Sequence, residues 1–252
     1  DYYKDTYISK MVSYIEQYKV DAVRCNYEIV NKNKTTEKGL IKDIKNNVLD
    51  NKAKDELITL ILSGEIPCYT PLLLIKKEIL NDISFKEDIH MMEDVIFYLD
   101  LLVKINSIYI SDDILYTITY NENSATNSYK NYERNILNII EVNKYIKDIL
   151  KKENLASKKN INCLNMNSLN AISDYIFKTY LYNPNKAMNL CKTLKNNNYF
   201  INIIENTNIN LLNFQRRKII IYIKDESYLK LSLYFKLRKI IYKIRRIKWK
   251  IF

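Results

Sequence analysis

Residues 21–30 read DAVRCNYEIV, and this stretch decides the fold class. β-Branched and aromatic residues dominate it, which is typical of a β-strand. A helical pattern precedes it over Thr6–Tyr18, and a helix headed by two acids and further strand patterns follow it. The order strand, helix, strand, strand predicts an α/β fold and not a helical bundle.

The acid-headed helix lies in residues 90–102, HMMEDVIFYLDLL. Its apolar residues from Val95 to Val103 recur with the spacing of one buried helical face. Glu93 and Asp94 stand in the first turn, where acids interact favourably with the positive end of the helix dipole. The pair therefore has a purely structural explanation, and the alternative is that one of the acids moves a proton.

Four other segments give weaker signals. Asp50–Leu62 predicts a helix ended by Ser63 and Gly64. Pro67 and Pro71 exclude a central strand from the segment that holds them. The polar stretch Asn31–Lys38 predicts a loop, and Asp112-Asp113 predicts a turn between two short strands.

Beyond Asn127 the pattern is helical and no strand is predicted, except that QRRKIIIYIKDE fits either a strand or a helix. We therefore expect three parts, namely an α/β part over 1–128, a helical region over 129–225, and a basic amphipathic helix over 226–252.

The amino-acid composition argues against several kinds of site and structure. The 252 residues include only two Gly and three Pro, so tight turns are expected to use Asn and Asp. The four cysteines lie far apart and form no CxxC pair, which argues against a zinc site or a disulfide framework and favours reduced thiols. The single histidine, His90, cannot build a multi-histidine metal site, and no apolar run reaches the length of a transmembrane helix.

Five segments occur in a recognisable order: Asp1-Tyr2-Tyr3 with the helix after it, DAVRCNYEIV, PLLLIKKEILNDISF ending at Phe85, MMEDVIF, and ILYTITYNENSAT. Together they resemble the C-terminal half of family 2 glycosyltransferases, the bacterial GT-A enzymes of cell-surface polysaccharide synthesis. The resemblance covers roughly the first half of the chain.

The resemblance implies a fold, a reaction and a set of partners. The fold would be an incomplete GT-A layer, Rossmann-like, followed by an all-helical region. The reaction would be an inverting transfer of a hexose from a UDP-sugar type of donor to a glycan or a lipid-linked acceptor. A divalent metal, Mg or Mn, is expected for the full-length enzyme.

The same resemblance assigns roles to individual residues. Asp94 corresponds to the catalytic base, and Glu93 would orient the acceptor. Asp1 would be the last acid of the metal-binding Asp-x-Asp motif. The expected substrate-binding residues are Lys76, Tyr116, Asn123 and Ser124.

The sequence also departs from the family. The nucleotide-binding acids and the rest of the metal motif would lie upstream of Asp1, so the resemblance predicts a fragment or a chain paired with another. Thr119 stands where the family often has Arg or His, and Tyr69-Thr70-Pro71 replaces the usual acceptor-side sequence.

The end of the chain, LSLYFKLRKIIYKIRRIKWKIF, carries much of the formal net charge of +11. Its apolar residues follow a 4-3-4-3-4 spacing from Leu233 to Ile251, which predicts an amphipathic helix. Lys243, Arg245, Arg246 and Trp249 suit an anionic membrane surface, and would place the protein in the cytoplasm on the inner face of the cell membrane.

Two alternatives stay open for this end of the chain. Its apolar face could pack on the protein's own helices, and its basic face could follow nucleic-acid phosphates, which is the least favoured of the three. For the whole chain, the alternative to an enzyme is a non-catalytic, basic, helical protein that binds a membrane or a nucleic acid.

Overall fold

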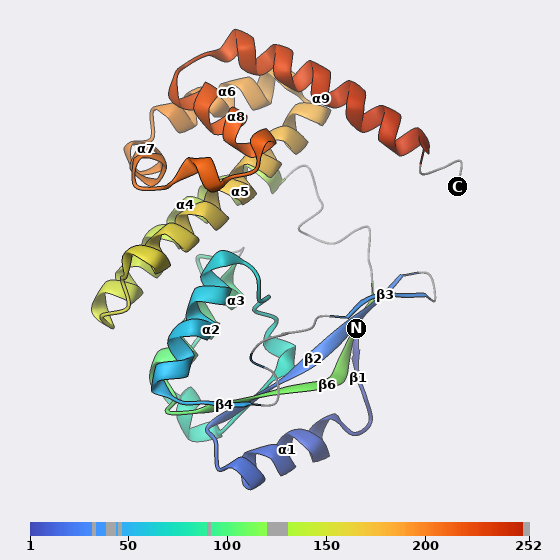
Figure 1. Cartoon of the computed structure of the whole chain (residues 1–252), viewed down its shortest axis with the longest axis vertical. Helices are drawn as coiled ribbons and strands as arrows, with labels where there is room; N and C mark the ends of the chain where they lie inside the picture. The colour runs from blue at the N-terminus through green and yellow to red at the C-terminus, as the bar shows by residue number, and fades with distance from the viewer. Residues whose placement is uncertain (32–33, 39–43, 45–46, 90–91, 120–130, 249–252) are drawn as a thin grey trace. The chain divides into compact units, whose positions relative to one another are not determined.

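The computed structural model describes residues 1–31, 34–38, 44, 47–89, 92–119 and 131–248 (Figure 1). The chain forms two compact units, the first from residues 1–124 and 146–160 and the second from residues 125–145 and 161–252. All strands in the described residues lie between Tyr2 and Thr119, and the described residues from 131 onward form helices and their connections. The predicted order, an α/β part followed by an all-helical part, is confirmed.

A parallel pair of strands forms the middle of the sheet, β2 (Ala22–Asn31) and β6 (Ile108–Thr119). Shorter strands pair antiparallel with these two: β1 (Tyr2–Tyr3) and β4 (Asn47–Leu49) with β6, and β3 (Lys34–Lys38) and β5 (Leu73–Ile75) with β2. The predicted strand at DAVRCNYEIV is therefore the centre of a mixed sheet.

Helices cover both faces of this sheet (Figure 1). Helix α1 (Tyr7–Tyr18) lies on one side, and α2 (Asn51–Ser63) and α3 (Glu93–Lys104) lie on the other. Parallel strands covered on both faces are buried, and the first six residues of β2, Ala22–Tyr27, are buried.

Alternation along β2 decides which side chains each face receives. Cys25 and its neighbours at odd positions belong to the apolar cluster that contains Tyr7 and Met11 of α1. Because successive side chains of a strand point to opposite faces, Arg24 and Asn26 point to the side of α2 and α3. Both are buried, so β2 carries a charged and a polar side chain into the interior.

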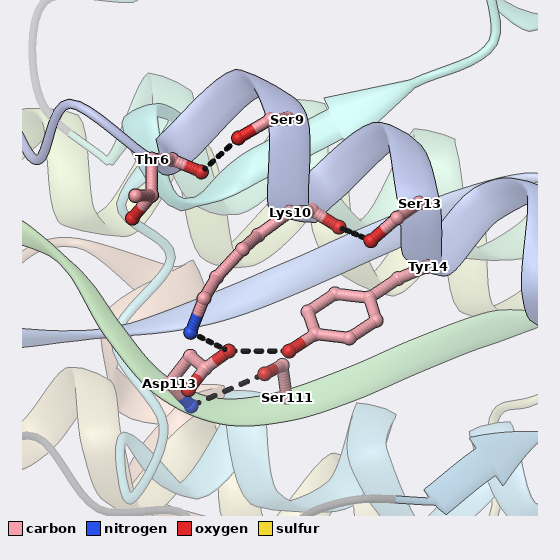
Figure 2. A network of polar contacts seen from close by, with 7 residues as sticks. All are labelled: Thr6, Ser9, Lys10, Ser13, Tyr14, Ser111 and Asp113. Carbon is pink, nitrogen blue, oxygen red and sulfur yellow. Dashed lines mark hydrogen bonds and ion pairs between the residues drawn. The ribbon is translucent and has the colours of Figure 1, made fainter.

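Asp112 and Asp113 do not form the predicted turn. They lie inside the single strand β6, at a point where its register with β2 shifts and extra residues bulge out. Figure 2 shows the Asp113 carboxylate accepting hydrogen bonds from the Tyr14 hydroxyl and from Lys10 Nζ at 3.0 Å, while its backbone N–H donates to Ser111 Oγ. The acid thus fixes α1 on the bulge, a contact between segments about a hundred positions apart that local patterns cannot predict.

The polar segment Asn31–Lys38 was also predicted wrongly as a loop. Its residues Lys34–Lys38 form β3, which pairs with β2 alone and is an edge strand of the described sheet. Edge strands tolerate polar sequences, so composition did not reveal this one. The predicted helix over Asp50–Leu62 and the exclusion of a central strand around Pro67 and Pro71 are confirmed.

The described remainder of the chain is helical. Short 3-10 turns lie at Thr70–Leu72, Lys77–Asp82 and Ile209–Leu211, and the long helices are α4 (Tyr132–Lys152), α5 (Lys158–Tyr182), α6 (Pro184–Lys195), α7 (Asn198–Glu205), α8 (Phe214–Lys224) and α9 (Tyr228–Lys248). The ambiguous segment QRRKIIIYIKDE is helix α8. Within the described residues, no helix combines the length and apolarity needed to cross a membrane.

Asparagine begins three consecutive helices of the second unit, as a chain poor in glycine requires. Asn183, Asn197 and Asn213 each accept, through the side chain, a backbone N–H of the first turn of α6, α7 and α8. The expected use of Asn and Asp in tight turns is met only in part, since the non-glycine residues with positive φ in the described chain are Lys19, Met92, Asn154 and Glu226. The four cysteines are free thiols, as expected.

Lys54 connects α2 to the end of α3. Its side chain is buried, and its Nζ donates to the carbonyl oxygens of Leu102, at 3.0 Å, and Ile105. These carbonyls lie at the negative end of the helix dipole, where a cation is favoured. Burial lowers the pKa of Lys54, so the two hydrogen bonds offset the cost of removing its charge from water.

We therefore expect Lys54→Met to lower the free energy of unfolding by about 1–3 kcal/mol, because it leaves buried carbonyls without their donor. Urea denaturation measures the change. Lys77→Met, at an exposed position, is the matched control and should change stability by about 0.5 kcal/mol or less. Equal stability of both variants would contradict the bridging role of Lys54.

Candidate active site

The candidate site is centred on Asp94, in the first turn of α3, which begins at Glu93 as predicted. The residue before the helix, Met92, has φ 64° and ψ 19° and makes no side-chain cap bond. This left-handed conformation costs a non-glycine residue roughly 1–2 kcal/mol. Asp94 Oδ1 accepts the N–H of Val95 at 2.8 Å, so the acid does contribute to the helix start.

Burial nevertheless dominates the chemistry of Asp94. Its pKa is raised to about 6, first by burial and then by the neighbouring charge of Glu93, while the backbone N–H groups of Val95 and of Asp94 itself lower it by less. Burial and the helix terminus act in opposite directions on a carboxylate, and here burial wins. A carboxyl group with a pKa near neutrality is suited to accept a proton at physiological pH.

The buried thiol of Cys68 feels the charges of both Asp94 and Arg24. Burial raises the pKa of the Cys68 thiol, the negative charge of Asp94 raises it further, and the positive charge of Arg24 lowers it. Arg24 donates from Nη2 to the carbonyl oxygen of Pro67, at 3.1 Å, and so holds the segment before Cys68 against β2. Cys68, next to Pro67, therefore links the surroundings of Asp94 on α3 to those of Arg24 on β2.

Arg24 is fully buried but only partly satisfied. Its Nε and Nη1 atoms have no hydrogen-bond partner among the described residues. The Tyr98 hydroxyl, on the next turn of α3 after Asp94, is also buried without a well-aligned hydrogen bond among the described residues, and the charge and proximity of Arg24 lower its pKa against the larger effect of burial. A positive charge thus remains beneath the site with few groups to compensate it, which is costly for stability.

An aromatic pair lies beside the first turns of α3. The rings of Phe85 and Phe97 stack with their centroids 4.6 Å apart and their planes 8° from parallel. Phe97 is buried, whereas Phe85 is 48% exposed. Phe97 follows Asp94 by three residues on the same helix, so the partly exposed Phe85 ring stacks on a near neighbour of Asp94.

A second polar group gathers where β1, β2 and β6 meet. The carboxylate of Asp1 accepts from the Tyr116 hydroxyl at 3.2 Å and from the N–H of Thr119 at 2.8 Å. Nearby in the register, Glu28 accepts from Lys4 Nζ at 2.6 Å and from Thr117 Oγ1 at 3.0 Å. The structure therefore brings together two predicted site residues, Asp1 and Tyr116.

These residues do not by themselves form a metal centre. Within the part of the chain that the structure describes, no three acidic, histidine or cysteine side chains converge to hold a metal. Both oxygens of Asp1 already accept hydrogen bonds, so the divalent metal stays a prediction and no chemical step here depends on it.

The other predicted residues are placed separately. Lys76 Nζ lies 3.5 Å from Asp21 Oδ1, next to the start of β2, about 20 Å along that strand from Glu28 and Tyr116. Glu93 is half-buried. Asn123, Ser124 and His90 lie outside the described residues, as does Trp249. Lys243 is exposed on α9, while Arg245 and Arg246 lie in the same helix with undescribed side chains.

Arg24 and Cys68 were not predicted as site residues. The available signal for Arg24 was a lone charged residue inside an apolar strand, at a position that alternation sends inward. Cys68 gave no signal, because its neighbourhood depends on contacts between distant segments.

No family model matches the sequence, and no curated protein matches it. Among solved structures, the chain is similar to residues 1–349 of the glycosyltransferase TarS of S. aureus. In complex with UDP-GlcNAc, that structure has a TM-score of 0.49 and 15% identity, covering 89% of this chain and 65% of that one. The complex of the same TarS residues with UDP has a TM-score of 0.38 and 16% identity, covering 89% of this chain and 64% of that one. The chain thus spans less than two thirds of these TarS chains, and functional inference depends on the side chains around Asp94.

The raised pKa of Asp94 predicts how stability depends on pH. Above pH 6 the folded state holds a carboxylate that would be better solvated in the unfolded chain, so Asp94→Asn should raise the free energy of unfolding at pH 8 by about 1–2 kcal/mol. The gain should disappear as the pH falls to about 3, where the carboxyl group is largely protonated in both states. Urea denaturation at the two pH values measures the effect. An equal loss of stability at both would instead mark Asp94 as only a helix-start residue.

Proposed function

We propose that the chain carries the acceptor-side part of an inverting GT-A-type glycosyltransferase of family 2, with Asp94 as the catalytic base. The donor would be a UDP-sugar and the acceptor a glycan or a lipid-linked sugar of a bacterial cell-surface polysaccharide. The observation that carries the proposal is a half-buried carboxyl group, with its pKa raised to about 6, at the position of the MMEDVIF motif.

In the proposed reaction, the acceptor hydroxyl oxygen attacks the anomeric carbon from the face opposite the nucleoside diphosphate. Asp94 takes the hydroxyl proton as the new C–O bond forms, and the bond between the anomeric carbon and the diphosphate oxygen breaks with its electron pair on the leaving group. The proton on Asp94 is then released to water. A divalent metal, when bound, would neutralise charge on the leaving diphosphate.

The surroundings of Asp94 suit this role. The exposed face of Phe85, held flat by its stack on Phe97, offers a surface on which the C–H groups of an acceptor sugar can lie. Glu93, half-buried one residue before Asp94, is assigned to orient the acceptor hydroxyl. Backbone N–H groups in the first turn of α3 limit how far burial raises the pKa of Asp94, which favours the ionised base.

The donor side is proposed from the sequence resemblance. Tyr116, Asn123 and Ser124 are assigned to the donor and Asp1 to the metal. Lys76 was expected to bind substrate, but its ion pair with Asp21 gives it a structural partner. The proposed location is the cytoplasmic side of the cell membrane, where a UDP-sugar and a lipid-linked acceptor can meet.

One observation favours the alternative of a non-catalytic binding protein. Asp94 Oδ1 accepts the N–H of Val95, as an acid that only begins a helix would. The enzyme and the binding protein predict different effects of the same substitution of Asp94, because replacing this residue lowers turnover only if it is the catalytic base.

We expect Asp94→Asn to lower the transfer rate by about 10² to 10⁴. Glu93→Gln should cost less, because orientation is easier to replace than proton transfer. The test measures sugar transfer from a panel of UDP-sugars, including UDP-GlcNAc, by the natural polypeptide that carries these residues, using membranes of the source organism as acceptor.

Asp100→Asn is the matched control. Asp100 lies on the same helix, and burial raises its pKa too, but it stands about two turns from Asp94. Its amide variant should keep close to the normal rate. Normal turnover by Asp94→Asn would return the acid to the helix-start role and refute the proposed mechanism.

The pH profile gives an independent test. A base with a pKa of about 6 is protonated, and therefore inactive, at lower pH, so kcat/KM should fall about tenfold per pH unit below that value. The residual activity of Asp94→Asn should lack this dependence. A profile of the normal enzyme that stays flat from pH 7 to pH 5 would contradict the assignment.

A further inference from the structure

Helix α9 is held to the second unit by one apolar face. Leu231 and Phe235 are fully buried, and the Phe235 ring lies 4.8 Å from that of Tyr180 and 5.7 Å from that of Phe177. Arg238 continues this face, with its guanidinium 3.9 Å from the Phe177 ring and Nη2 donating to Gln215 Oε1 at 2.9 Å. These contacts pack one face of α9 against the other helices of the second unit.

The same helix has a second apolar face that is exposed. Its residues, called here the outer stripe, are Leu229, Leu233, Leu237, Ile240 and Ile244, which are 85%, 60%, 62%, 55% and 50% exposed. At about 100° per residue they fall within an arc of about 80°, centred about 180° from the docked face. The apolar face predicted from the 4-3-4-3-4 spacing therefore does not pack on the protein's own helices within the described residues.

Lysines border the outer stripe on both sides. Lys236 and Lys243 follow one edge of it and Lys230 the other, and all three are exposed. From Tyr228 to Lys248 the helix has no acidic residue. An apolar stripe between rows of lysine matches the depth profile of a bilayer surface, with acyl chains below and anionic headgroups beside them.

We propose that the outer stripe of α9 binds the surface of an anionic lipid bilayer, with the helix lying in the plane of the interface. A second copy of the chain is a poorer occupant, because it would bring lysines against lysines around the shared apolar surface. Nucleic acid is poorer still, because it offers nothing for five exposed aliphatic side chains. The inference does not depend on the proposed enzymatic function.

The experiment is sedimentation of the 252-residue chain with vesicles. The chain should sediment with phosphatidylcholine vesicles containing about 30 mol% phosphatidylglycerol, and much less with phosphatidylcholine alone, since anionic lipid attracts the lysines. Leu233→Gln/Leu237→Gln should lower the partition coefficient at least about tenfold. Lys236→Gln/Lys243→Gln should lower it about 10- to 30-fold on anionic vesicles and weaken its salt dependence.

Control variants remove the same kinds of side chain, leucine and lysine, from exposed positions on other helices. Leu137→Gln changes an exposed leucine of α4, and Lys158→Gln/Lys159→Gln removes two exposed charges at the start of α5. These variants should bind vesicles like the unmodified chain, and all variants should melt alike because the changed side chains are exposed.

Three results would overturn the proposal. The first is vesicle binding that the stripe variant retains in full. The second is a concentration-dependent dimer, seen by sedimentation velocity and abolished by Leu233→Gln/Leu237→Gln, which would assign the stripe to a second copy. The third is binding of duplex DNA without binding of vesicles. None of these readouts requires sugar transfer, so failure here leaves the proposed function to its own test.

Discussion

The parallel pairing of β2 with β6 is the constraint from which the first unit follows. A parallel pair is normally covered on both faces, so α1 must occupy one side of it and α2 and α3 the other. Alternation along β2 then sends Cys25 to α1 and Arg24 to α3. Because Arg24 reaches Pro67, the same strand also fixes the segment that carries Cys68 beside Asp94.

The charged groups at the two ends of α3 differ in how far hydrogen bonds compensate for their burial. At the C-terminal end, Lys54 meets helix carbonyls, and its hydrogen bonds compensate for its burial. At the N-terminal end, Met92 adopts a left-handed conformation, Asp94 is half-buried with a raised pKa, and two Arg24 nitrogens have no hydrogen-bond partner among the described residues. Strain and uncompensated charge at one end of an otherwise regular helix are typical of a site selected for chemistry over stability.

The sequence predicts those parts of the structure that local pattern determines. Hydrophobic periodicity correctly predicted α3 and the helical second half, and β-branched and aromatic composition predicted β2. Prediction from the sequence failed at Asp113, where an acid expected in a turn instead joins α1 to a bulge of β6. It also failed at β3, where the strand depends on pairing with β2 and not on its own composition. Arg24 and Cys68 could not be joined to Asp94, because their proximity is created by tertiary packing.

Helix α9 shows a further limit of prediction from hydrophobic periodicity, and the charged residues of the helix help to resolve it. Periodicity identified an apolar face but not whether that face meets protein or solvent. The structure docks the opposite face, through Leu231 and Phe235, and leaves the predicted one exposed. A helix that needed only to complete the core would gain solubility from polar residues there, so the exposed aliphatic stripe supports the proposed contact with another apolar phase. The lysines at its edges, with no acid in the helix, favour a phase that also presents negative charge. A bilayer surface meets both conditions with the same lipid molecules.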